Sequence, residues 1–210
     1  MLKDSTLIVV RAVFGVLTLA ALVTQLRVHI GMGAPVLNFF SFFTILSNLF
    51  AGLVLLYGVW QLLSFQPPPA WYEPIRGAAV VYMVVVGVVF VTLLRNTDLG
   101  GLRPWVNTVH HYVMPVVMVL EWLLRPPARR LDASALLPCL AFPVIYLVYT
   151  LLRGASTSWY PYPFLNPANV GGYGVVALYI LGMIAVFLLA GWFLILRVGS
   201  RGTARAAAHR

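Results

Sequence analysis

Charged residues are scarce in this chain. Only 9% of its 210 residues are Asp, Glu, Lys or Arg, whereas 61% are hydrophobic. A domain that folds in water carries charge on about a quarter of its residues. So little charge cannot cover a water-exposed surface, and the composition therefore excludes an ordinary soluble domain and favours a chain embedded in lipid.

Cysteine and the common cofactor motifs are also missing or rare. The single cysteine, Cys139, excludes an intramolecular disulfide. We find no glycine-rich phosphate loop, no cysteine-rich metal motif and no heptad array. Two adjacent histidines on a straight helix do not easily hold one metal ion, so we expect no metal and no cofactor.

Long apolar runs are what the sequence does have. Turn-forming clusters rich in Pro and Gly separate six of them, and in lipid each backbone amide must be paired within its own helix. We therefore predict an all-α polytopic membrane protein in which residues 1–198 form one bundle of six transmembrane helices: Ser5–Leu26, Val36–Leu63, Ile75–Leu94, Trp105–Leu124, Ala133–Leu152 and Gly172–Leu196.

The excess of positive charge predicts the orientation of these spans. The chain has 14 Lys and Arg against 5 Asp and Glu, a net charge of +9. Six spans place both termini and nine of the basic residues on one side, with four on the other, so the positive-inside rule puts both termini in the cytoplasm. We expect the basic tail, residues 199–210, to contact anionic lipid headgroups and not nucleic acid.

The second span carries polar residues at helical spacing. Asn38, Ser41, Thr44 and Asn48 fall within about 120° on a helix of 3.6 residues per turn. Such a stripe turns toward the bundle centre. It is typical of hydrogen bonding between helices, which the spacing alone favours over the alternative of a functional cavity.

The fourth span contains two ionisable side chains, His110 and His111. Intramembrane histidines indicate function, although packing against a partner carbonyl also explains one of them. In the predicted topology Thr44 lies about 12 Å and His111 about 9 Å below the outer end of its span. A hydroxyl and an imidazole at similar depth suit nucleophilic acyl chemistry, because histidine can take the proton of a weak alcohol nucleophile.

Four segments resemble one known family when they are taken together: "FFTILSNLF", "HHYVMPVVMVLEWLL", "YLVYTLLRG" and "YPYPFLNP". They are similar to the androgen-induced and androgen-dependent six-pass membrane proteins and their bacterial relatives. The resemblance extends from the second span to the loop before the sixth. It implies an intramembrane threonine hydrolase that cleaves fatty acid esters of hydroxy fatty acids. It further implies that Thr44 is the nucleophile and that His111, ten residues before Glu121, is the base.

Several residues have open assignments beside this pair. His110 fits the proline spacing better than His111, and Ser41 is a second hydroxyl near Thr44. Asn48 and Asn107 are candidate amide donors to the oxyanion of acyl transfer, or else hydrogen-bond between helices.

The fifth span and the loop that follows it supply candidate substrate contacts. Tyr149 and Arg153 share a face of the span, where the cation can hold a lipid carboxylate or anchor the helix. Tyr162 and Phe164 belong to the aromatic loop "SWYPYPFLNP", which either caps a cavity above Thr44 or forms part of an interfacial aromatic belt.

The remaining intramembrane charges have simpler interpretations. Glu121 is expected to pair with Arg125 one turn later, and Arg11 to extend its guanidinium to the cytoplasmic boundary. We therefore predict a lipid ester hydrolase of a bacterial inner membrane, since frequent Ala, Val, Gly and Arg are typical of a GC-rich bacterial genome. The alternative is a non-enzymatic transporter or lipid-binding protein with a buried polar cavity.

Overall fold

The computed structural model describes residues 4–97, 101–127 and 130–199, and every regular element within them is a helix. The all-α expectation is therefore confirmed. In chain order the elements are α1 (Asp4–Gly31), α2 (Val36–Phe40), α3 (Phe43–Leu63), α4 (Tyr72–Val89), η1 (Phe90–Leu94), α5 (Pro104–Thr108), η2 (Val109–Val113), α6 (Met114–Leu124), η3 (Ala133–Ala135), α7 (Leu136–Thr157), η4 (Pro163–Leu165), α8 (Pro167–Val170), α9 (Tyr173–Gly191) and η5 (Trp192–Val198).

Five helices in the described part of the chain are long and apolar enough to cross a membrane: Asp4–Gly31, Phe43–Leu63, Tyr72–Leu94, Ala133–Thr157 and Tyr173–Val198. These helices indicate an integral membrane protein. The predicted fourth span is helical from Pro104 to Leu124, as α5, η2 and α6 in succession. It is less apolar than the five because it contains Asn107, two histidines and Glu121.

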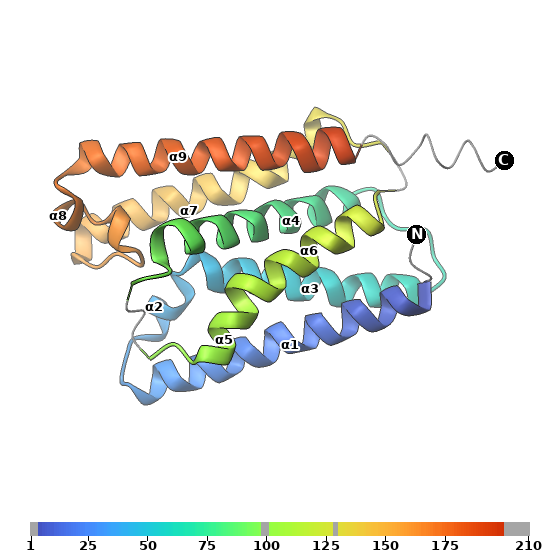
Figure 1. Cartoon of the computed structure of the whole chain (residues 1–210), viewed down its shortest axis with the longest axis horizontal. Helices are drawn as coiled ribbons and strands as arrows, with labels where there is room; N and C mark the ends of the chain where they lie inside the picture. The colour runs from blue at the N-terminus through green and yellow to red at the C-terminus, as the bar shows by residue number, and fades with distance from the viewer. Residues whose placement is uncertain (1–3, 98–100, 128–129, 200–210) are drawn as a thin grey trace.

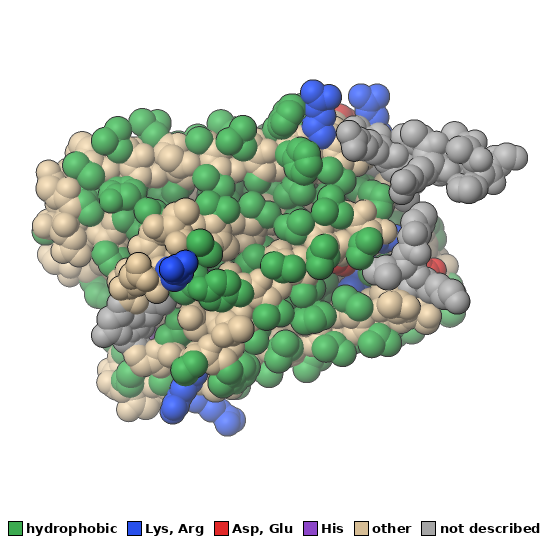
Figure 2. Space-filling model, viewed as in Figure 1, with side chains coloured by type: hydrophobic (Ala, Val, Ile, Leu, Met, Phe, Trp, Pro, Cys, Tyr) green, Lys and Arg blue, Asp and Glu red, His purple; other side chains and the backbone are tan. Residues whose placement is uncertain are grey.

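The long helices lie side by side, and α4 contacts α3, α6, α7 and α9. Figure 1 shows the run from α5 to α6 crossing the bundle obliquely, and α1 beginning at the same end at which η5 finishes. Hydrophobic side chains cover much of the visible side of the bundle, and the Lys and Arg side chains lie toward its ends (Figure 2). Except for Gly199, the predicted tail lies outside the described residues.

The contact between α1 and α3 is close because small residues face each other. A Cβ atom on Gly15 would lie 2.9 Å from the Leu56 side chain, and one on Gly52 would lie 2.8 Å from the Thr18 side chain. Small residues at a helix crossing let two backbones approach within a membrane. This contact fixes the α1 and α3 side of the bundle.

The second predicted span is not one helix, which corrects the expected polar stripe. Ser41 and Phe42 separate α2 from α3, and the Ser41 hydroxyl donates to the Leu37 carbonyl at 2.7 Å. Phe42 has an extended backbone, so α3 begins at Phe43. The four polar residues of the stripe consequently lie on two helices and a break, and they face different partners.

Glu121 and Arg11 also differ from their expected roles. The Glu121 carboxylate accepts from Arg11 Nε at 2.9 Å and from Arg76 Nη1 at 2.7 Å. The Arg76 guanidinium also binds Glu73 at 2.7 Å and lies 4.4 Å from the Trp122 ring. Arg11, Arg76 and Glu121 are each at least 96% buried, so Arg11 does not extend to the boundary. Arg125, the expected partner of Glu121, instead binds Asp4 at 2.7 Å.

Candidate functional site

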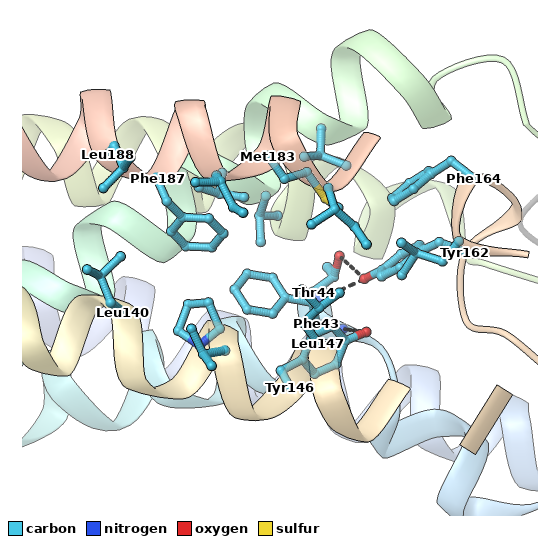
Figure 3. Close-up of a pocket in the computed structure, with 18 of the residues that line it drawn as sticks. Phe43, Thr44, Leu140, Tyr146, Leu147, Tyr162, Phe164, Met183, Phe187 and Leu188 are labelled. Atoms are coloured by element: carbon cyan, nitrogen blue, oxygen red, sulfur yellow. Dashed lines mark hydrogen bonds between the residues drawn. The ribbon is translucent and has the colours of Figure 1, made fainter. Parts of the chain in front are cut away.

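A cavity of about 300 Å³ lies between the start of α3, α4, α7, α9 and the η4 loop. Its walls are almost entirely aliphatic and aromatic, and the only polar side chains among its lining residues are those of Thr44, Tyr146 and Tyr162. Figure 3 shows the hydroxyls of Thr44 and Tyr162 beside each other, with Leu140 and Leu188 at the opposite end of the view from Tyr162. The cavity is therefore apolar along its length and polar near Thr44.

The first turn of α3 supplies the backbone of this polar end. The first N–H groups of a helix have no partner within the helix, and here the residue before the helix, Phe42, gives no side-chain cap. Tyrosine hydroxyls from other segments take that role. The Phe43 N–H donates to Tyr146 Oη at 3.2 Å, and the Thr44 N–H donates to Tyr162 Oη at 3.1 Å. Tertiary contacts thus fix the position of the Thr44 hydroxyl.

Tyr162 joins the aromatic loop to Thr44. The Tyr162 Oη lies 3.4 Å from Thr44 Oγ1. Because Tyr162 Oη accepts from the Thr44 N–H, the phenol O–H can still donate to a second group. Burial raises the pKa of the Tyr162 phenol above its ordinary value, so the phenol stays neutral. The Phe164 ring stacks on Tyr162 with centroids 5.2 Å apart, and both line the cavity; a cap over a cavity was one of the two roles considered for this loop.

His111 lies in the π-helical turn η2, one turn before Pro115. Proline lacks the N–H that would bond the carbonyl four residues earlier, and a wider turn accommodates this defect. The His111 ring stacks on Phe90 with centroids 4.0 Å apart, and Nδ1 lies 2.7 Å from Asn107 Oδ1. Since a carbonyl oxygen only accepts, this bond places the proton on Nδ1 and leaves the lone pair on Nε2.

Thr44 and the histidines do not meet directly. Among the described residues no hydrogen bond joins Thr44 to His110 or His111, and neither histidine lines the cavity. Asn48 connects the two regions, because its Nδ2 donates to the Thr44 carbonyl at 2.9 Å and to the His110 carbonyl at 3.4 Å. The His110 side chain is buried, and its Nε2 has no hydrogen-bond partner among the described residues. The structure therefore brings Asn48 to Thr44 but leaves both imidazoles apart from it.

Four of the other predicted residues form two hydrogen-bonded pairs near the break between α2 and α3. The Ser41 hydroxyl lies 2.8 Å from Tyr149 Oη, and Arg153 Nη2 donates to Asn38 Oδ1 at 2.6 Å. The Arg153 guanidinium also lies 4.6 Å from the Trp159 ring. Ser41, Tyr149 and Arg153 do not line the cavity, so in this structure they attach α2 to α7.

The apolar wall of the cavity was not predicted. It includes Val85 and Val89 of α4, Leu140 and Val144 of α7, and Ile184 of α9. Every membrane span is rich in such residues, so no local pattern separates those that line a cavity from those that face lipid. Only the arrangement of the helices reveals them.

The described residues hold no group of three His, Cys, Asp or Glu side chains that could bind a metal ion. Comparison of the chain with protein-family models, with curated proteins and with solved structures gives no match. The functional interpretation consequently depends on the geometry of the cavity and on the chemistry of the side chains around Thr44.

Proposed function

We propose that the protein is an intramembrane hydrolase of lipid esters and that Thr44 is its nucleophile. The observation that supports this proposal most strongly is the position of the Thr44 hydroxyl, at the polar end of a cavity whose other walls are apolar. An acyl chain matches the apolar walls, and its ester carbonyl then lies at the end where Thr44 and Tyr162 supply polar groups. Fatty acid esters of hydroxy fatty acids are substrates of this kind.

The proposed reaction is acyl transfer through threonine. Thr44 Oγ1 attacks the ester carbonyl carbon while its proton passes to histidine, and the tetrahedral intermediate then expels the alcohol, which takes that proton. Water attacks the acyl-threonyl ester in the same manner and releases the fatty acid. Each half of the reaction breaks one C–O bond and forms another, so no cofactor or metal is needed.

Tyr162 is the best placed donor to the oxyanion. Its Oη lies 3.4 Å from Thr44 Oγ1 and can donate toward that side, whereas Asn48 Nδ2 is already bonded to the carbonyls of Thr44 and His110. A donor aimed at the developing charge lowers the barrier by about 3–4 kcal/mol. We therefore assign to Tyr162 the role that the sequence suggested for Asn48 or Asn107.

His111 is the proposed base, and Asn107 positions it. The bond from Nδ1 to Asn107 leaves the Nε2 lone pair ready to accept a proton. The proposal requires Nε2 to reach Thr44 in the substrate complex, because catalytic hydrogen bonds often form only when substrate is bound. His110, whose Nε2 has no hydrogen-bond partner in the described part of the chain, is the competing base.

We further propose six spans with both termini in the cytoplasm of a bacterial cell, in its inner membrane. The start of α1 and the end of η5 lie at the same end of the bundle, as an even number of crossings requires (Figure 1). The helical run Pro104–Leu124 supplies the sixth crossing. The basic residues expected at this end support the orientation.

A second candidate function is lipid binding without chemistry, as in a carrier or transporter. The separation of Thr44 from both imidazoles favours it, because an unassisted threonine hydroxyl is a weak nucleophile. The cavity and its apolar lining suit this alternative equally well.

Covalent labelling with a fluorophosphonate distinguishes the two functions. The proposed hydrolase is labelled on Thr44, so Thr44→Ala abolishes labelling, Thr44→Ser retains it and His111→Ala weakens it strongly. Thr92→Ala is the matched control, since Thr92 is an exposed threonine whose hydroxyl donates to the Val88 carbonyl of its own helix and does not line the cavity. Labelling that persists in Thr44→Ala rejects this nucleophile, and a wild-type protein that resists labelling favours the lipid-binding alternative.

A further inference from the structure

The two sides of the cavity differ in their exposure. Phe43, Val85 and Val86 line the inner side and are buried within the bundle. On the other side, Val144 of α7 and Ile184 and Leu188 of α9 line the same cavity, yet they are 58%, 43% and 52% exposed. A side chain that both lines a cavity and faces outward lies at its mouth. The cavity therefore opens between α7 and α9.

This mouth lies in the middle of the bundle and not at its ends. Val144 is about 12 Å along α7 from Leu136, and Ile184 is about 16 Å along α9 from Tyr173. At that depth the surroundings of a membrane protein are hydrocarbon. The end near Thr44 is closed instead by Tyr162, Phe164 and Leu165, all of which are buried.

The two helices that border the mouth, α7 and α9, lie at the periphery of the bundle. Only 17% of the residues in the most apolar stretch of α7 are buried, and the same is true of α9, against 61% for α4. Both helices therefore face the surroundings of the bundle along much of their length. None of the described residues that line the cavity is charged and most are aliphatic or aromatic, so an apolar group fits most of its length.

The length of the lining sets a limit on the occupant. The lining extends from Ile180 to Leu188 along α9, which is about 12 Å. Carbon–carbon bonds of about 1.5 Å advance an extended chain by roughly 1.3 Å each, so this length holds about nine or ten carbons. Leu140 and Leu188 lie farthest from Tyr162 (Figure 3).

We propose that a lipid acyl chain enters this cavity sideways from the bilayer, between α7 and α9, and that about ten of its carbons fit beyond Thr44. The inference rests on the proposed function only for the position of the reacting carbonyl. Lateral entry and chain binding need no chemistry at Thr44.

Photo-crosslinking in lipid nanodiscs tests this entry route without hydrolysis. The probe is a fatty acid with a diazirine near the end of its chain, applied to the full-length protein. Ile184→Trp fills the mouth and should lower crosslinking about tenfold, equivalent to about 1.4 kcal/mol of binding. Leu181→Trp is the matched control, because Leu181 is 60% exposed on the same helix but does not line the cavity. Crosslinking of Leu181→Trp should stay within about twofold of that of the wild type.

A second pair of variants, on α7, keeps the test valid if one of the α9 variants fails to fold. Val144→Trp should act like Ile184→Trp, whereas Ile145→Trp, at a position that is exposed but outside the lining, should not. Leu140→Trp shortens the cavity. The chain length of the fatty acid that competes best with the probe should therefore be shorter for this variant than for the wild type.

The outcomes separate this inference from the proposed hydrolase. Thr44→Ala should crosslink like the wild type, and crosslinking that follows the expected pattern supports lateral entry even if fluorophosphonate labelling fails. Equal crosslinking in Ile184→Trp and Leu181→Trp overturns the entry route while labelling of Thr44 would still support the enzyme. A dimer whose interface is formed by α7 and α9 in the nanodisc would also overturn it, because the mouth would then be covered by protein.

Discussion

Two groups of polar side chains within this bundle have different surroundings. Arg11, Arg76 and Glu121 lie where α1, α3, α4 and α6 pack closely, and each charge has an opposite charge within hydrogen-bond distance. Thr44 and Tyr162 form the second group, at the polar end of the cavity, where their hydroxyls border an apolar space. The first group is saturated by its own partners, and the second has hydrogen-bonding capacity left for a ligand.

This contrast shows that charge alone does not identify a site in a membrane. An intramembrane carboxylate such as Glu121 is the usual first candidate for function. Here it accepts hydrogen bonds from two arginines, shares the charge of Arg76 with Glu73 and connects three helices, which is a structural task. Neutral hydroxyls beside a cavity have weaker local signals but the better geometry for binding and reaction.

The largest expected effect comes from breaking the charged group. Glu121→Gln leaves two buried guanidinium groups without a full counter-charge, and removing one partner of a buried ion pair costs about 3–5 kcal/mol. We expect the free energy of unfolding in detergent micelles to fall by that amount. Denaturant titration followed by circular dichroism measures it.

The control for this prediction is the exposed ion pair at the same end. Arg125→Gln breaks only the bond to Asp4, and an exposed pair contributes about 0–1 kcal/mol. If Glu121→Gln were no less stable than Arg125→Gln, the network of Arg11, Arg76 and Glu121 would not stabilise the packing of these helices.

The next largest effect tests the cavity region. Tyr162→Phe removes the hydroxyl that binds Thr44, and loss of one oxyanion donor should slow ester hydrolysis and fluorophosphonate labelling by about 10²-fold. Its effect on the free energy of unfolding should be only about 1 kcal/mol. Tyr160→Phe, in the same loop but outside the cavity lining, serves as control. Equal rates in the two variants would remove Tyr162 from the reaction.

A smaller effect compares packing in the two regions. Gly52→Leu places a side chain where Thr18 and Leu19 already lie, and overpacking of this kind costs about 1–3 kcal/mol. Gly182→Leu on α9 meets open space, so it should leave the free energy of unfolding unchanged or raise it slightly. Similar losses in both variants would contradict the difference in packing.

The smallest effect concerns alkaline pH. The raised pKa of Tyr162 means that the folded protein keeps this proton when the unfolded chain, near pH 10, releases it. Stability contributed by this group is complete below pH 10 and is lost as the pH rises toward the folded pKa. The wild type should therefore lose up to about 1.4 kcal/mol per pH unit more than Tyr162→Phe. Parallel unfolding curves for the two proteins between pH 9 and 11.5 would show that Tyr162 is not shielded.

Sequence patterns predicted the parts of this molecule that depend on local composition. Apolar runs and Pro-rich connections indicated the long helices. The aromatic loop was recognised as a possible cap, and Tyr162 and Phe164 indeed line the cavity.

The errors arose where distant residues decide the structure. The break at Ser41 and Phe42 is stable because Tyr146 and Tyr162, more than 100 positions later, accept the free N–H groups of α3. Glu121 was paired with its neighbour Arg125, whereas its partners lie on α1 and α4. A cavity is a gap between helices, and no single segment encodes it.

The central claim is that Thr44 reacts with an ester whose chain occupies the cavity. A structure of the protein after reaction with a long-chain fluorophosphonate tests it most directly. We predict phosphorus bonded to Thr44 Oγ1, with the chain passing between α7 and α9 toward Leu140 and Leu188. An adduct on another residue, or a chain that lies outside this cavity, would contradict the account.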